Sequence, residues 1–216
     1  MNSSEAVNTD AARPRAYGGR RASDRKAERR ERLMQAGLEL FGTAGYPSSS
    51  IEKLCARAGV STRNFYEEFT GREALLIALY GRILEEAAVA IGVALTDTAQ
   101  ESMRPRVERA IRAYVRTMAE DPRWARLAYV EVIGVSQAVE QFRMGWRNNY
   151  VDLLVGEAER AAARGEAPPR DYRLSSLGLI GAINEMVHQW TIADGGIDQE
   201  ELVAEIVRVA MAVLSN

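Results

Sequence analysis

The sequence predicts an all-α protein in which three N-terminal helices, including a helix-turn-helix unit, lead through a long helix into a larger helical domain. Apolar residues recur at three- and four-residue steps along most of the 216 residues, which is the period of an amphipathic helix. The breaks between these segments are short and rich in Gly, Pro and Asp, as turns are. No segment alternates apolar and polar residues as a half-buried strand would, so no sheet is expected.

The composition is that of an ordinary globular protein, with 47% hydrophobic and 27% charged residues. Cys55 is the only cysteine, which excludes an intrachain disulfide and a cysteine metal cluster and fits a reducing cytoplasm. We expect no metal site and no cofactor. No apolar run reaches the length of about 18 residues that a transmembrane helix needs, so we expect a cytoplasmic protein with no membrane partner.

Charge is unevenly distributed along the chain. Basic residues outnumber acidic ones from Met1 to Arg72, whereas acidic residues predominate in the remainder. This asymmetry indicates that the N-terminal end meets a polyanion. Residues 1–23 are polar and lack an apolar period, and they are expected to form a disordered arm. The arm is either a solvated tail or a segment whose arginines touch phosphates; the candidates are Arg13, Arg15, Arg20 and Arg21.

The first predicted helix begins at Asp24, a possible N-cap, and ends before Gly45, which favours a left-handed stop. A short second helix follows, and Ser49 and Glu52 have the spacing of a capping box at its start. Cys55 falls on the apolar face of this helix and is expected in the core.

A tight bend joins the second helix to a short third helix. Gly59 breaks the second helix, and Ser61 can cap the third, which directs Phe65 and Phe69 inward. Two short helices joined in this way form a helix-turn-helix unit, whose second helix can enter the major groove of DNA.

The rest of the chain is predicted to be helical. A long helix starts near Arg72 and runs to about Leu95. The later helices are expected at about 105–119, 122–133, 138–164, 172–192 and 199–214.

The segment "GYPSSSIEKLCARAGVSTRNFYEEFTGREALL", Gly45 to Leu76, resembles the TetR family of bacterial transcriptional repressors. The likeness extends over residues 29–80 and depends on many positions at once, including the Ala58-Gly59-Val60-Ser61 bend, Tyr66 and Phe69. It implies a sequence-specific, homodimeric repressor that binds a palindromic double-stranded DNA operator and is released by a small apolar or amphipathic effector. The implied division is a helix-turn-helix domain at 24–71 and a ligand-binding and dimerisation domain at 72–216.

The resemblance also implies a set of DNA-facing residues. Two serines at the start of the second helix, a tyrosine and an arginine would contact phosphates, and the start of the third helix would read bases. The residues are Ser49, Ser50, Thr62, Arg63, Asn64, Tyr66 and Arg72. Many family members have Gly or Pro in place of Arg63, so no base preference is implied.

Glu67 and Glu68 depart from the family pattern, because carboxylates near phosphates would be repelled. They are expected to point aside, with Arg72 as a candidate partner. The alternative is that one of them accepts a hydrogen bond from a cytosine amino group.

Aromatic and polar residues of the second domain are candidates for an effector pocket, although each is also a candidate for ordinary core or interface packing. They are Tyr114, Trp124, Tyr129, Phe142, Trp146, Asn184, His188 and Trp190. The last two helices carry more apolar residues than one helix needs for its own core, and they are expected to pair with their copies in a dimer. The residues are Leu179, Ile180, Ile183, Met186, Val187, Trp190, Leu202, Ile206, Val209, Ala210 and Val213.

Two other classes of function remain open at this point. An enzyme is possible, although no phosphate loop or "HExxH" motif occurs and Cys55 is expected in the core, away from any histidine. A helical module that binds a protein partner and never touches DNA is the third possibility.

Overall fold

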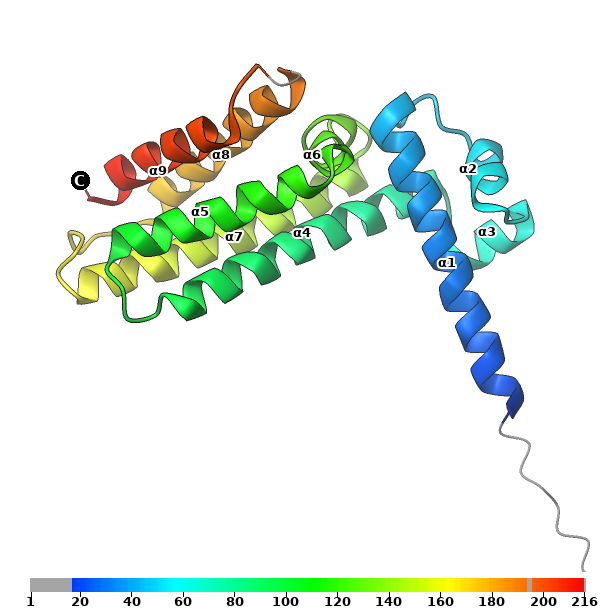
Figure 1. Cartoon of the computed structure of the whole chain (residues 1–216), viewed down its shortest axis with the longest axis horizontal. Coiled ribbons are helices and arrows are strands. Elements are labelled where there is room, and N and C mark those ends of the chain that lie inside the picture. Colours follow the sequence, from blue (N-terminus) through cyan, green and yellow to red (C-terminus); the bar gives the residue numbers. More distant parts are fainter. Residues whose placement is uncertain (1–16, 194–195, 216) are drawn as a thin grey trace, which may run out of the picture.

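Helices form the regular structure of residues 17–193 and 196–215, which are the residues described by this computed structural model (Figure 1). Within these residues no strand occurs, so the predicted all-α fold is confirmed. The elements are α1 (Tyr17–Ala44), α2 (Ile51–Ala58), α3 (Thr62–Glu68), α4 (Arg72–Asp97), α5 (Met103–Glu120), α6 (Pro122–Arg126), a π-helix η1 (Leu127–Glu131), α7 (Gln137–Ala163), α8 (Arg173–Ile192) and α9 (Gln199–Ser215).

The first helix begins earlier than expected. Since α1 starts at Tyr17, the prediction of a helix start at Asp24, with a disordered arm up to residue 23, is wrong for residues 17–23. Helix formation is cooperative, and extending an existing helix adds a hydrogen bond for each residue fixed, so α1 can continue through a segment without an apolar face. Arg13 and Arg15 lie outside the described residues.

The buried residues of the N-terminal domain belong to an apolar core that continues into the following helices. Phe41, Leu54 and Phe65 come from α1, α2 and α3, and each is fully buried. Gly37 lets α4 approach α1 closely, because a Cβ there would lie 2.8 Å from a methyl carbon of Leu79. Cys55 is buried in the same core, as predicted, and burial raises the pKa of its thiol.

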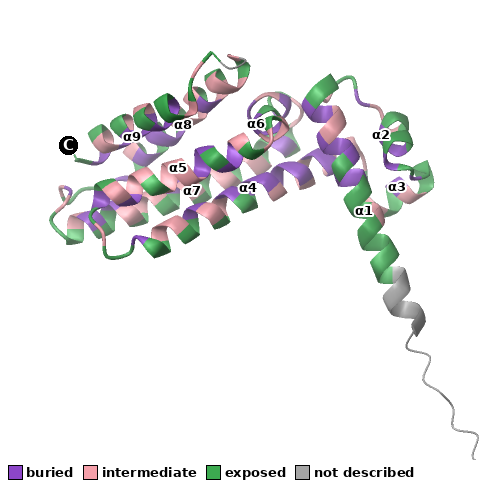
Figure 2. Ribbon diagram, in the orientation of Figure 1, coloured by how far each residue is buried: buried purple, intermediate pink, exposed green. Residues whose placement is uncertain are grey.

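The remaining helices form an elongated bundle that extends away from the N-terminal domain (Figure 1). Helix α4 starts beside α1 and runs the length of the bundle next to α5, while α9 packs on α5 and α8. Buried residues line the inner faces of these helices, and exposed residues follow their outer faces (Figure 2). In the part of the chain that the structure describes, no helix is both long and apolar enough to cross a membrane.

Many apolar residues of the last two helices pack inside the monomer. Leu179, Val187, Leu202 and Ile206 are at most 4% exposed, so the interpretation of these residues as a surplus for dimer contacts is wrong. These residues are buried because α9 packs on α5 and α8 packs on α6 and α7, which the sequence period alone does not reveal.

Candidate nucleic-acid interface and effector cavity

The bend between α2 and α3 has the expected backbone. Gly59 has φ 62°, a left-handed conformation that ends α2, and the Val60 N–H donates to the Cys55 carbonyl at 3.0 Å. The Ser61 hydroxyl accepts from the Asn64 N–H at 3.2 Å and caps α3. These contacts fix the angle at which α3 leaves α2.

Helix α3 has one buried face and one free face. Phe65 is fully buried, whereas the Arg63 side chain is 90% exposed and Tyr66 is 56% exposed. Thr62 is exposed and Asn64 is half-buried. The structure therefore brings the predicted base-reading residues and Tyr66 together on one accessible helix.

The two predicted phosphate-binding serines differ in their surroundings. The Ser49 side chain is fully buried, and its hydroxyl donates to the Gly45 carbonyl at 2.8 Å. The prediction that this hydroxyl contacts a phosphate is therefore wrong. The N-cap of α2 is Ser50, whose hydroxyl accepts from the Lys53 N–H at 3.3 Å, and not Ser49 with Glu52. Ser50 is half-buried and lies beside the N-terminus of α2, where backbone N–H groups favour an anion.

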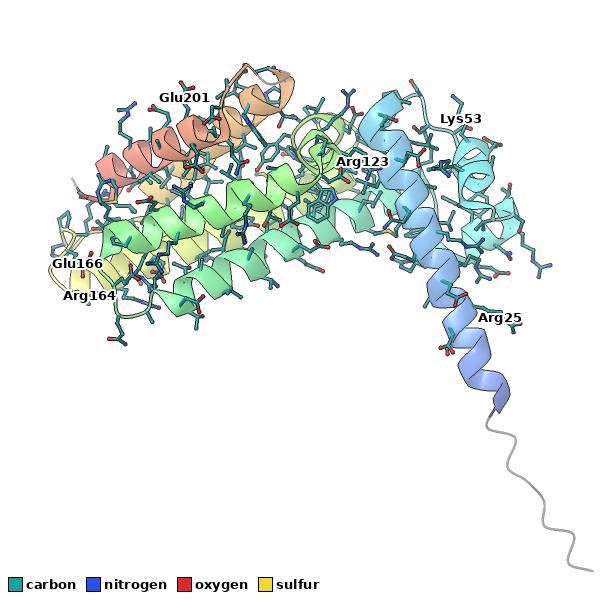
Figure 3. All side chains as sticks on the ribbon, viewed as in Figure 1. Arg25, Lys53, Arg123, Arg164, Glu166 and Glu201 are labelled. Carbon is teal, nitrogen blue, oxygen red and sulfur yellow. The ribbon has the colours of Figure 1, made fainter. Side chains whose placement is uncertain are left out.

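Lys53 is a cation at this helix start that the sequence reasoning missed. Its side chain projects outward from α2 (Figure 3), and Nζ donates to the Ser48 carbonyl at 2.8 Å. The sequence did contain a signal for this residue. Lys53 follows a possible N-cap serine by three residues, in a domain whose net charge is basic.

Arg72 holds the loop between α1 and α2. Its Nη1 donates to the carbonyls of Tyr46 at 3.1 Å and Ser49 at 2.7 Å, and its guanidinium lies 4.8 Å from the centre of the Tyr46 ring. The residue predicted to hold a phosphate is thus also part of the support that positions α2.

The glutamate pair turns toward α1. Glu68, whose side chain is 1% exposed, accepts from Arg29 Nη2 at 2.6 Å, and Glu67 lies 3.3 Å from the same nitrogen. The pairing with Arg72 was wrong, because Arg29 of α1 faces the end of α3 whereas Arg72 faces the loop before α2. Glu67 also lies 3.6 Å from Arg63 Nε, which places a carboxylate next to the exposed arginine of α3.

A long cavity runs through the second domain between α4, α5, α7, α8 and α9. Of the predicted pocket residues, the cavity wall contains Tyr114, Tyr129, Trp146 and Asn184. The others lie outside it, and their assignment is wrong; these are Trp124, Phe142, His188 and Trp190. Phe142, for example, packs against Gly81 and the Tyr80 ring, because the absence of a side chain at residue 81 leaves room for it.

Most of the cavity wall is aliphatic or aromatic, but arginines of α7 also reach it. Sequence reasoning did not identify Tyr80 and Tyr150 as part of this wall. It also missed Arg143 and Arg147, since charged residues on a long helix are usually solvated. Burial raises the pKa of the Tyr129 and Tyr150 hydroxyls, so both remain neutral, and the Tyr150 hydroxyl donates to the Leu84 carbonyl at 3.2 Å.

Two family models match the chain, one for each domain. The model for bacterial regulatory proteins of the tetR family matches residues 33–79, and the tetracyclin repressor-like C-terminal domain matches residues 100–214. The chain belongs to the TetR family. It is therefore a DNA-binding transcriptional regulator and not an enzyme, which removes the enzyme and the non-DNA-binding module from consideration.

Curated relatives of this TetR-family chain align along nearly all of its length. The HTH-type transcriptional activator FasR of Mycolicibacterium smegmatis is 26% identical over 208 residues, covering 94% of this chain and 91% of FasR. The HTH-type transcriptional regulator EthR of the same organism is 27% identical over 212 residues, covering 93% of each.

A solved structure supports the TetR-family fold independently. The transcriptional regulator FadR from Bacillus subtilis, in complex with stearoyl-CoA, superposes with a TM-score of 0.71 at 23% identity. The superposition covers 86% of this chain and 97% of that one. The likeness extends through both domains, so the bundle around the cavity shares its architecture with FadR.

Proposed function

We propose that the chain is a homodimeric repressor that binds a palindromic operator and is released by a long-chain amphipathic effector with an anionic head. In this proposal residues 24–71 bind DNA in the cytoplasm, and residues 72–216 bind the effector and dimerise. The observation that carries the effector assignment is a long apolar cavity whose wall contains two buried arginine nitrogens without partners.

The length of the cavity favours an extended ligand. On α4 its wall runs from Tyr80 to Leu95, which at 1.5 Å per residue is about 22 Å. Apolar side chains dominate the wall between these points, for example Leu84, Ile91 and Ile183. Such a channel suits an alkyl chain better than a compact ring system, because a chain can fill its whole length and bury apolar area throughout.

The head of the effector is assigned from the arginines. Within the described part of the chain, Arg143 Nε and Arg147 Nε are buried and have no hydrogen-bond partner in the protein. Arg143 Nη1 pairs with Glu140 at 2.5 Å, whereas Arg147 forms no ion pair with the described residues. An unsatisfied buried donor is costly, and on a guanidinium it is best satisfied by a carboxylate or phosphate oxygen.

The arginines at the far end of the cavity have no free charge for an anionic head. Arg106 pairs with Glu157 at 2.6 Å, and Arg164 pairs with Glu166 at 2.8 Å, so their charges are already compensated. Figure 3 shows Arg164 and Glu166 at the end of the bundle remote from α1–α3. An anionic head is therefore expected at Arg147, with the unpartnered Nε of Arg143 one helical turn before it as a second donor. The stearoyl-CoA named with Bacillus subtilis FadR combines a long acyl chain with phosphates, and it supports this class of ligand.

Dimer formation is proposed through the outer face of α8, next to α9. The exposed residues of α8 recur at helical spacing. Five of them are apolar or lack a side chain, namely Leu174, Leu177, Gly178, Gly181 and Ile192, and the other three are Arg173, Glu185 and Gln189. Leu174 is 81% exposed. An apolar stripe of this kind is typical of an isologous interface, in which the same helix of each subunit meets its copy.

Selection on sheared genomic DNA tests the proposal directly. The full-length protein is expected to enrich fragments that share a palindrome with half-sites about 34–36 Å apart, and stearoyl-CoA is expected to release them. Sites that overlap promoters would agree with repression, whereas sites upstream of promoters would indicate activation, the role in the name of FasR. Failure to enrich any fragment would contradict the proposal.

Replacing Arg147 with Met is expected to weaken binding of stearoyl-CoA by about 10-fold or more, because hydrogen bonds to a charged group contribute about 1.5–3 kcal/mol. Met keeps much of the length of the side chain and removes its charge and donors. Isothermal titration of the purified protein measures the change.

The matched control for this variant is Arg160→Met. Arg160 also lines the cavity, but it lies 3.5 Å from Glu157, at the end of the cavity where the arginines pair with carboxylates. It should change the affinity by less than about 3-fold, as expected for a side chain whose charge is already satisfied. Equal losses in the two variants would contradict the placement of the head.

A further inference from the structure

The junction between the two domains contains an irregular helix. Helix α6 passes directly into the π-helix η1, which spans Leu127–Glu131. On the N-terminal side of η1, α6 packs tightly on α1, since a Cβ at Gly42 would lie only 2.6 Å from the Arg123 Cβ. Figure 3 shows Arg123 at this contact between α6 and α1.

Glu131, the last residue of η1, reaches across the junction. Its Oε2 accepts from the Tyr46 backbone N–H at 2.7 Å, and its Oε1 accepts from Arg126 Nε at 3.0 Å. The Glu131 side chain is 7% exposed. Gly45 has φ 88°, and a Cβ there would lie 3.3 Å from Oε2, so a glycine beside Tyr46 permits this approach. A buried carboxylate that binds a backbone N–H is a strong, charge-assisted contact.

The loop that Glu131 holds also positions the DNA-facing elements. Arg72 binds the carbonyls of Tyr46 and Ser49 in this loop, and Ser50 at its end caps α2. A change at Tyr46 is therefore passed to the start of α2 and, through the fixed bend, to α3.

The same π-helix forms part of the cavity wall. Ala128 and Tyr129 line the cavity, whereas Glu131 contacts the loop. A π-helix and an α-helix are discrete hydrogen-bonding registers, and single-turn π-helical segments are frequent at functional sites. Moving η1 by one residue into the α register would turn Glu131 about 100° around the helix axis, away from the Tyr46 N–H.

We infer that Glu131 couples the effector cavity to the DNA-binding domain. In the effector-free protein the Glu131–Tyr46 contact holds the loop before α2 in its DNA-competent position. An effector packed against Tyr129 changes the register of η1 and withdraws the carboxylate. The inference rests on the proposed function, because it describes how the effector reaches operator binding. Glu131 is a positioning residue and contacts neither DNA nor effector in this scheme.

The test measures the operator dissociation constant with and without saturating stearoyl-CoA. In the wild type the ratio of the two constants is expected to lie in the range of about 5–150 that is typical of allosteric coupling. In Glu131→Ala the ratio should fall to within about twofold of 1, because the loop no longer senses η1. Glu131→Gln keeps an oxygen that can accept from the Tyr46 N–H and is expected to restore most of the wild-type ratio.

Glu39→Ala is the matched control, since it removes the same charge from a salt bridge with Arg57 that stays inside the N-terminal domain. Its ratio should equal that of the wild type. Hydrogen exchange adds a direct readout: stearoyl-CoA should speed exchange of the Tyr46 amide in the wild type and not in Glu131→Ala.

Two results would overturn the inference, and they are distinguishable. If the wild type responds to stearoyl-CoA and Glu131→Ala responds equally, the coupling role fails while the proposed function stands. If the wild type itself does not respond, the effector assignment fails, and the inference that depends on it fails too. Denaturant titration of each variant checks that a lost response is not caused by unfolding.

Discussion

Leu177→Arg is expected to convert the protein into monomers and to weaken operator binding by about 100-fold or more. Leu177 lies on the exposed stripe of α8, next to Gly178. In an isologous interface the new charge would be buried close to a like charge, which is strongly unfavourable. Each monomer would then hold one recognition helix and lose the gain from binding two half-sites at once. Sedimentation equilibrium and operator titration measure the two effects.

Val89→Arg is the control for this substitution. Val89 is an exposed aliphatic residue on α4, which lies on the other side of the bundle from α8 and α9 (Figure 1). It should leave both the mass in solution and operator affinity unchanged. A dimeric Leu177→Arg protein, or a monomeric Val89→Arg protein, would show that the interface lies elsewhere.

Arg63→Ala is expected to weaken operator binding by about 1–3 kcal/mol per half-site, while binding to unrelated DNA falls much less. The Arg63 side chain is 90% exposed on α3 and contacts no core residue, so its loss should not unfold the domain. Glu67, its neighbour at 3.6 Å, keeps Arg29 as a partner. Fluorescence anisotropy with the selected operator and with a scrambled duplex separates the two affinities.

A second arginine variant controls for the loss of charge. Arg116 is exposed on α5, in the effector domain, and Arg116→Ala changes the net charge equally. It should reduce both affinities slightly and by the same factor. If Arg63→Ala also lowers both affinities by one factor, Arg63 contacts phosphate and does not read a base.

Local sequence signals were sufficient for most of the helical framework. The Gly59 bend, the Ser61 cap and the inward Phe65 all depend on interactions within a few residues, and all are present as predicted. A capping hydroxyl or a left-handed glycine acts on its immediate neighbours, so the sequence contains the needed information. The capping-box spacing of Ser49 and Glu52 was misleading, because the adjacent Ser50 offered the same chemistry one residue later.

Contacts between distant residues could not be obtained in this way. Arg29 and Glu68 are 39 positions apart, and Tyr46 and Glu131 are 85 apart, so nothing in the local pattern pairs them. The wall of the cavity is a similar case. Trp124 and Trp146 have the same chemistry, but only Trp146 faces the cavity, because the rotation of each helix is set by its neighbours.

The sequence by itself therefore determined the helices, the helix-turn-helix unit and the family, since these follow from periodicity, capping and a contiguous motif. Only the tertiary structure decided which serine is buried, where the glutamate pair turns, which apolar residues of α8 remain exposed and which arginines face the cavity. The physical reason is that a helical period shows which residues share a face. What that face meets depends on the packing of helices that are far apart in the chain.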